Sequence, residues 1–96
     1  MFPLANSCVR KEVHFSGHVQ GVGFRQTVCM MAEGYVMTGY VVNLSDGRVK
    51  LVTEGDSQQL EDFLMALSTR MEQYIWDIHT ECLPSTGDFS RFDIIF

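Results

Sequence analysis

The apolar residues of the chain recur at two spacings, one typical of strands and one typical of helices. Residues 9–16 show the first spacing loosely, with Val9, Val13 and Phe15 set among charged neighbours and Gly17 placed as a stop. A side chain that faces the core at every second position is the mark of a half-buried strand. We therefore predict a first strand over residues 9–16.

Four more runs carry strand signals. Residues 37–43 are rich in β-branched and aromatic side chains, and residues 48–54 alternate polar with apolar. Asp46–Gly47 lies between these two runs and is a strong turn signal, so together they predict a β-hairpin. The remaining strands are predicted over residues 75–83 and 92–96.

Two segments repeat their apolar residues at helical spacing. The first ends near Gly34, the expected terminator, and its apolar face comprises Phe24, Val28, Met31, Ala32 and Tyr35. The second follows Asp56 or Ser57, either of which can cap it, and Gln59 is placed for a capping-box-like contact. Its apolar face comprises Leu60, Phe63, Leu64, Leu67 and Met71.

The resulting order of elements is βαββαβ with an extra short C-terminal strand. This order predicts an α+β fold, a ferredoxin-like α/β sandwich in which two helices cover one face of an antiparallel sheet. Residues 9–96 would form this domain, and residues 1–8 a flexible N-terminal lead-in. We expect Trp76 in the core, and a solvated acidic patch around the start of the second helix that comprises Glu54, Asp56, Glu61 and Asp62.

Three glycines and an arginine are concentrated between Gly17 and Arg25, in the segment that joins the first strand to the first helix. Glycine permits a positive φ and leaves no Cβ to keep a ligand away. The amide hydrogens of such a loop can converge on an anion where the helix dipole is positive. Arg25 would lie in the first helical turn, and its planar guanidinium suits two phosphate oxygens. The segment therefore predicts a small anion site.

The predicted topology brings one more polar residue to this site. The first helix returns the chain, so the first and second strands run in the same direction. The end of the first strand, the start of the first helix and the end of the second strand then share one edge of the domain. Asn43 lies at the end of the second strand and should face the loop that carries Arg25.

Composition narrows the class of protein. The 96-residue chain is 46% hydrophobic and 20% charged, which fits a single soluble globular domain. Its formal net charge of −5 argues against nucleic acid as a partner, because nucleic-acid-binding proteins present a basic surface. No apolar run approaches the ~18 residues that a membrane span needs, and the first residues do not form a signal peptide.

The cysteines indicate the compartment. They are odd in number, widely spaced and without a CxxC pair, namely Cys8, Cys29 and Cys82. Such thiols are typical of a reduced, cytoplasmic protein. No histidine has an acidic or cysteine partner at metal-ligand spacing, so we expect neither a metal nor another cofactor. We also expect a monomer.

The run Gly-His-Val-Gln-Gly-Val-Gly-Phe-Arg over residues 17–25 strongly resembles the signature of the acylphosphatases, small enzymes that hydrolyse the carboxyl–phosphate bond. The resemblance continues through residues 39–43, 46–49 and 54–55 and covers roughly residues 9 to 96. It is specific, because two motifs agree in order and in distance.

The resemblance implies a metal-independent hydrolysis of acyl phosphates to carboxylate and phosphate. The phosphate-binding residues would be Val19, Gln20, Gly21, Val22, Gly23, Phe24 and Arg25. The side-chain amide of Asn43 would hold the attacking water. The resemblance also implies that no side chain acts as general base and that a substrate phosphate oxygen takes the proton.

Three departures from the family pattern bear on this interpretation. His18 stands where arginine is frequent, so it could tune substrate binding with pH. Tyr40 replaces a frequent tryptophan, and Val36 occupies the position of a glycine that usually ends the first helix. A different helix end could shift the strand that carries Asn43.

Two other functions stay open at this point. The chain could be a non-catalytic anion-binding or interaction module of the same fold, although simple phosphate binding would not require Asn43. It could also be a piece of a larger protein, since similar modules begin the hydrogenase-maturation carbamoyltransferases. The final strand and the lack of a following linker make us expect a free-standing domain instead.

Overall fold

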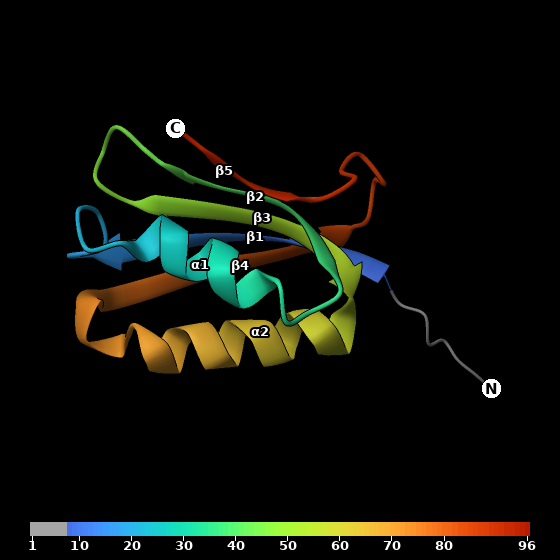
Figure 1. The fold of residues 1–96 in the computed structure, drawn as a ribbon, viewed down its shortest axis with the longest axis horizontal. Coiled ribbons are helices and arrows are strands. Elements are labelled where there is room, and N and C mark those ends of the chain that lie inside the picture. The colour runs from blue at the N-terminus through green and yellow to red at the C-terminus, as the bar shows by residue number, and fades with distance from the viewer. Residues whose placement is uncertain (1–7) are drawn as a thin grey trace.

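The computed structural model describes residues 8–96, and its elements follow the predicted order with one short 3-10 helix added (Figure 1). They are β1 (Cys8–Gly17), α1 (Phe24–Ala32), β2 (Met37–Asn43), β3 (Val49–Asp56), α2 (Ser57–Arg70), η1 (Glu72–Tyr74), β4 (Ile75–Pro84) and β5 (Phe92–Ile95). Cys8, assigned to the lead-in by the sequence, belongs to β1, and the rest of the predicted lead-in lies outside the described residues.

The five strands form one sheet in the order β4-β1-β3-β2-β5. β1 and β2 both pair antiparallel with β3, so they run in the same direction and finish at the same end of the sheet. The predicted ferredoxin-like sandwich is confirmed. The predicted antiparallel sheet is corrected in one pairing, because the extra strand β5 pairs parallel with β2. The connection from β4 to β5 joins opposite edges of the sheet instead of turning back as a hairpin, so β5 need not oppose its neighbour.

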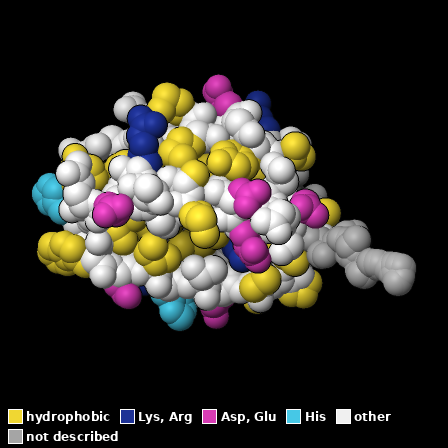
Figure 2. All heavy atoms as spheres, turned by 90° about the horizontal axis from the view of Figure 1, so that it is seen from below, with side chains coloured by type: hydrophobic (Ala, Val, Ile, Leu, Met, Phe, Trp, Pro, Cys, Tyr) yellow, Lys and Arg dark blue, Asp and Glu magenta, His cyan; other side chains and the backbone are white. Residues whose placement is uncertain are grey.

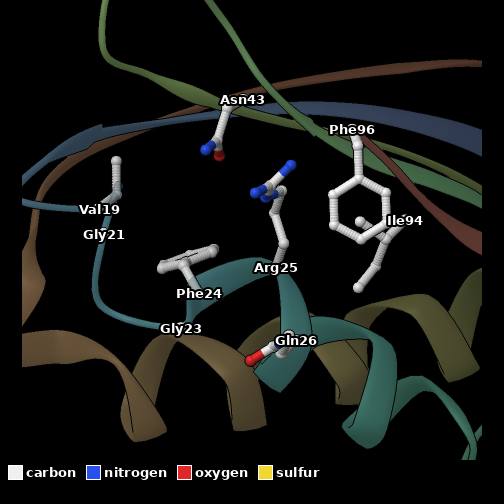
Figure 3. Close-up of a pocket in the computed structure, with 9 residues that line it drawn as sticks. All are labelled: Val19, Gly21, Gly23, Phe24, Arg25, Gln26, Asn43, Ile94 and Phe96. Atoms are coloured by element: carbon white, nitrogen blue, oxygen red, sulfur yellow. The ribbon is translucent and has the colours of Figure 1, made fainter.

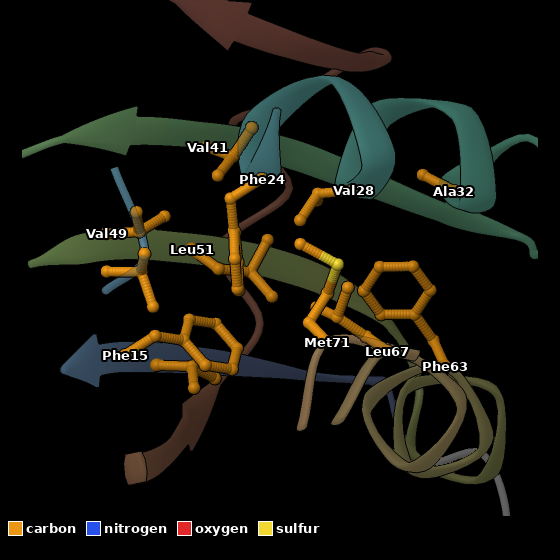
Figure 4. Packing of buried hydrophobic residues seen from close by; sticks show 12 residues of the cluster. Phe15, Phe24, Val28, Ala32, Val41, Val49, Leu51, Phe63, Leu67 and Met71 are labelled. Carbon is orange, nitrogen blue, oxygen red and sulfur yellow. The ribbon is translucent and has the colours of Figure 1, made fainter. Parts of the chain in front are cut away.

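The core lies between the sheet and the two helices (Figures 1 and 4). α1 contributes Val28 and Ala32, and α2 contributes Phe63 and Leu67, from the faces that the helical spacing predicts. The strands contribute fully buried side chains that include Val13, Phe15, Val41, Val49 and Leu51. Each fully buried large side chain is worth about 1.5–3 kcal/mol, so this layer dominates the stability of the fold.

Trp76 is not in the core, contrary to the prediction from strand alternation. Its side chain is 80% exposed. The register explains the difference, because Ser16 pairs with Asp77 whereas Gly17 pairs with Ile75. Residue 76 is therefore the extra residue of a β-bulge, and a bulge breaks the regular alternation of faces.

The helix ends differ from the prediction in two details. α1 ends at Ala32, two residues before Gly34, yet β2 still begins at Met37 and Asn43 keeps its place. Asp56 caps α2 by accepting hydrogen bonds from the next N–H groups, as predicted. The predicted capping box does not form, because the Gln59 Oε1 accepts the Val36 N–H at 3.1 Å instead. That contact ties the α1–β2 connection to α2.

The surface is mixed in character. Figure 2 views the molecule from the α2 side and shows hydrophobic side chains interspersed with charged ones, of which the acidic ones are more numerous than the basic ones. None of the helices in the described part of the chain is both long and apolar enough to cross a membrane.

Glu54, near the end of the central strand β3, forms a buried polar centre at the end of the sheet opposite to that where β1 and β2 finish, which corrects its predicted place in a solvated patch. Its side chain is only 4% exposed. The carboxylate accepts the Arg10 Nε–H at 2.8 Å, both the hydroxyl and the N–H of Thr86, the Ser85 hydroxyl and the Gly87 N–H. These bonds fasten the segment that leaves β4 and carries the chain toward β5.

Burial would raise the pKa of Glu54, but the hydrogen bonds from Thr86, Arg10 and Gly87 outweigh it and lower the pKa to about 2. A folded-state pKa below the ordinary value of 4.5 means that the charged form stabilises the fold. This stabilisation is complete above the ordinary value and is lost as the pH falls through about 2.

We predict that Glu54→Gln lowers the free energy of unfolding at pH 7 by about 2 kcal/mol, since it removes charge-assisted bonds from a buried site. Between pH 5 and pH 2 the stability of the wild type should fall more steeply than that of the variant. Urea unfolding across this range measures both effects. Asp88→Asn is the control, because Asp88 contacts the same arginine from an exposed position. Equal slopes for the wild type and Glu54→Gln would contradict the assignment.

Candidate active site

The loop between β1 and α1 curves around a small hollow, and two glycines give it its shape. Gly21 and Gly23 have φ values of 80° and 77°, in the left-handed region that other residues rarely adopt. Within residues 8–96, and apart from each glycine and its two chain neighbours, no atom lies within 4 Å of the position that a Cβ would take on either glycine. The backbone conformation itself, and not close packing, therefore requires glycine here.

The amides of this loop are available to a ligand. Among the described residues, no N–H of residues 18–26 donates to a backbone carbonyl, and the first such bond is that of Thr27 to Gly23 at 3.0 Å. Gly23 is the N-cap of α1 and provides no side-chain cap. The helix therefore begins with unsatisfied donors and a positive dipole end, a combination that favours an anion.

Gln20 fastens the loop to the β2–β3 turn. Its Nε2 donates to the carbonyl of Leu44 at 2.8 Å and to that of Arg48 at 2.9 Å. Leu44 directly follows Asn43, so these two bonds fix the distance between the glycine loop and the end of β2. The sequence indicated Gln20 only as part of the phosphate-binding run, and this positioning contact could not be found without the fold.

Arg25 extends from the first turn of α1 toward the end of β5. Its Nη1 donates to the carbonyl of Ile95 at 3.1 Å, and its Cζ lies 5.1 Å from the centre of the Phe96 ring. These contacts hold the guanidinium above the hollow, where Figure 3 shows it between the Asn43 amide and the Phe96 ring. The cation–π contact adds a modest attraction of about 0.5–1 kcal/mol at such an exposed position.

These groups surround a cavity of about 210 Å³. Its lining comes from the glycine loop, α1, β2, β5 and the residue that follows β5, and consists of Val19, Gly21, Gly23, Phe24, Arg25, Gln26, Asn43, Ile94 and Phe96. With ~30 Å³ for each water molecule of the liquid, the cavity is sized for a small ligand.

The cavity brings together most, but not all, of the predicted site residues. Val22 is half-buried against the core, and the side chain of Gln20 is engaged elsewhere. His18 is exposed and does not line the cavity. Sequence analysis missed Gln26, and it also missed the residues that β5 contributes, because no sequence signal told which edge of the sheet the last strand joins.

The charge of the cavity is simple. Of the described residues that line it, Arg25 alone carries a charged side chain, and none is Asp, Glu or His. In the described part of the chain, no three His, Cys, Asp or Glu side chains group as ligands of a metal ion. The positive potential therefore comes from one guanidinium and the loop amides, whereas Asn43 supplies a neutral group that can both donate and accept.

Comparison with known proteins finds similar sequences and similar folds. The family model described as Acylphosphatase matches residues 11–94. A protein named acylphosphatase from Caldanaerobacter subterraneus is 41% identical over 89 residues, which cover 90% of this chain and 99% of that protein. The crystal structure of acylphosphatase from Bacillus subtilis matches with a TM-score of 0.82 at 31% identity, and the match covers 92% of this chain and 99% of that one.

A longer protein contains a similar unit. The crystal structure of HypF from T. kodakarensis matches with a TM-score of 0.77 at 31% identity, and the match covers 90% of this chain but 12% of that one. The same fold thus occurs both as a small protein and as part of a larger chain.

We predict that Gln20→Met, which keeps the size of the side chain but removes both donors, weakens phosphate binding by about 3- to 10-fold and lowers Tm by several degrees. Each lost hydrogen bond contributes about 1 kcal/mol. Titration calorimetry with inorganic phosphate and thermal unfolding measure the two effects. Gln58→Met on α2 is the matched control, and an unchanged phosphate affinity in Gln20→Met would contradict the positioning role.

Proposed function

The chain belongs to the acylphosphatase family, and we propose that the cavity between the glycine loop, Arg25 and Asn43 is where it hydrolyses acyl phosphates to carboxylate and phosphate. The protein is accordingly a hydrolase that acts on the carboxyl–phosphate bond. The observation that carries the proposed site is the meeting of free loop amides, one guanidinium and one side-chain amide in a single small cavity.

The phosphate is held by the loop and Arg25 in this proposal. The N–H groups between Val19 and Arg25 bind its oxygens, and the Arg25 guanidinium forms charge-assisted bonds to them. Such donors are preorganised, so they stabilise charge on the transferring group without reorganising during the reaction. Family resemblance assigns this run to phosphate binding, and the assignment is supported by the five of its residues that line one cavity, namely Val19, Gly21, Gly23, Phe24 and Arg25.

Asn43 orients the attacking water. The water oxygen forms a bond to phosphorus while the bond from phosphorus to the acyl oxygen breaks, and the electron pair leaves with the carboxylate. A carboxylate is a good leaving group, so positioning and charge stabilisation are the main needs of this reaction. An amide side chain suits the role, because it can donate to and accept from one water.

The proton of the attacking water passes to a phosphate oxygen of the substrate. This step is consistent with the lining of the cavity, in which no described side chain is a carboxylate or an imidazole. His18 is an exposed residue of the loop that does not line the cavity, so we assign it only an effect of charge on substrate binding.

A non-catalytic anion-binding module of the same fold is the second candidate. It would use the loop and Arg25 and would have no need of Asn43. Asn43 lines the cavity at the end of β2, which favours the enzyme over the module.

We further propose that the chain acts as a cytoplasmic monomer on a small substrate, without nucleic acid or membrane, and that residues 9–96 are its functional domain. The net charge of −5 and the acidic side chains seen in Figure 2 argue against a polyanionic partner. The three cysteines are free thiols, as expected in a reducing compartment.

We predict that Arg25→Gln weakens inhibition by inorganic phosphate by about 10- to 100-fold and lowers kcat/KM for benzoyl phosphate by about 100- to 1,000-fold, because a charge-assisted clamp is lost. Asn43→Ala should bind phosphate within about twofold of the wild type but lose a similar factor in kcat. Steady-state kinetics with phosphate as competitor measures all four quantities.

Arg70→Gln, at the far end of α2, is the control for the loss of one positive charge. Unchanged turnover in Asn43→Ala would remove the water-holding role from Asn43. If instead both variants and the wild type bound phosphate but none of them hydrolysed an acyl phosphate, the protein would be a non-catalytic anion-binding module.

Hydrolysis is expected to continue at its full rate in a chelator such as EDTA, because loop amides and Arg25 supply the positive potential in the proposed mechanism. The assay compares benzoyl phosphate turnover before and after dialysis against the chelator. Activity that disappears on dialysis and returns with a divalent cation would reject the metal-independent mechanism.

A further inference from the structure

One side of the cavity is apolar, and the phosphate chemistry does not use it. Ile94 and Phe96 come from β5 and the residue that follows it, and both line the same cavity as Arg25 and Asn43. Ile94 is half-buried and packs against the core, so its position is fixed. Phe96 is 91% exposed, and its contact with Arg25 orients its ring at the mouth.

This apolar side lies where the departing group must go. An in-line displacement places the attacking water and the leaving oxygen on opposite sides of phosphorus. With the water on Asn43, the acyl group departs on the side away from Asn43. Figure 3 shows Ile94 and Phe96 across the Arg25 guanidinium from the Asn43 amide, and both residues line the cavity on that side.

The chemistry of the wall selects the kind of acyl group. An exposed phenylalanine loses water-accessible apolar surface when an apolar group packs on it, which favours association in proportion to the area buried. Arg25 is the one charged side chain among the described lining residues, and in the proposed mechanism it binds the phosphate. A second carboxylate on the acyl group would therefore find no cation in the cavity.

We propose that Ile94 and Phe96 form the acyl subsite of this enzyme, and that this subsite selects uncharged apolar acyl groups, aromatic ones above all, over small or acidic ones. The inference rests on the proposed function of the cavity. It adds the substrate class: the preferred substrate is an aromatic or larger aliphatic acyl phosphate, and not acetyl or succinyl phosphate.

A different role for Phe96 would be to position Arg25 through the cation–π contact alone. The two roles differ in what they change. If Phe96 only positions Arg25, its loss lowers kcat/KM by the same factor for every substrate, because all substrates share the phosphate. Loss of an acyl contact changes only the ratio between substrates.

The test compares kcat/KM for benzoyl, acetyl and succinyl phosphate in the wild type, Phe96→Ala and Phe96→Leu. The wild type should prefer benzoyl to acetyl phosphate. Phe96→Ala should reduce the benzoyl-to-acetyl ratio about tenfold, and Phe96→Leu, which keeps an apolar surface without a ring, should reduce it less. Met65→Ala removes a 74% exposed apolar side chain from α2 and is the control for exposed truncation.

A second arm does not depend on turnover. Benzoylphosphonate and acetylphosphonate lack the bridging anhydride oxygen and carry a direct carbon–phosphorus bond, and calorimetry measures their affinities directly. The wild type should bind the benzoyl compound more tightly, and Phe96→Ala should lose that advantage. If the wild type shows the advantage but hydrolyses no acyl phosphate, the proposed function fails and the subsite stands.

The subsite is overturned by any of three results. One is an equal affinity of the wild type for the two phosphonates, and another is a wild type that prefers succinyl to benzoyl phosphate. The third is a uniform loss across all substrates in Phe96→Ala with the ratios unchanged, which would assign Phe96 to the positioning of Arg25. Phe96 is exposed, so its truncation is not expected to prevent folding.

Discussion

The pairing of β1 and β2 with opposite sides of β3 is the constraint on which the site depends. Because both pairs are antiparallel, the two strands finish at the same end of the sheet. The glycine loop leaves one of these ends and Asn43 occupies the other, so two segments distant in sequence meet without any direct attraction between their functional groups. The hydrophobic layer of Figure 4 supplies the energy that holds this arrangement, and the hydrogen bonds of Gln20 set its final spacing.

The fifth strand makes the cavity asymmetric. The chain between β4 and β5 passes from one edge strand of the sheet to the other, and the Glu54 carboxylate fastens its first residues at the end of the sheet opposite to the cavity. β5 then runs parallel to β2 toward Arg25, where the Ile95 carbonyl accepts from the guanidinium. A buried acid at one end of the sheet thus supports the wall of a cavity at the other end, through a continuous piece of backbone.

Sequence reasoning succeeded where a signal was local or repeated. The hairpin, both helical faces and the meeting of Arg25 with Asn43 followed from periodicity, turn chemistry and handedness alone. It failed where a long-range contact decided the outcome. Glu54 has the composition of a surface residue and is buried only because the segment after β4 returns to it, and the partner of β5 depends on which edge of the sheet is free. The bulge at Trp76 inserts one residue into an otherwise regular alternation, and the residue type at that position does not predict a bulge.

That bulge has a spectroscopic consequence. Trp76 is the single tryptophan of the chain, and its indole is already largely in water in the folded state. Global unfolding therefore changes the surroundings of the fluorophore little, and its emission is a poor measure of the folded population. The indole lies against Gly17, where the glycine loop begins, so the same emission is a local reporter of movement at the entrance to the anion-binding loop.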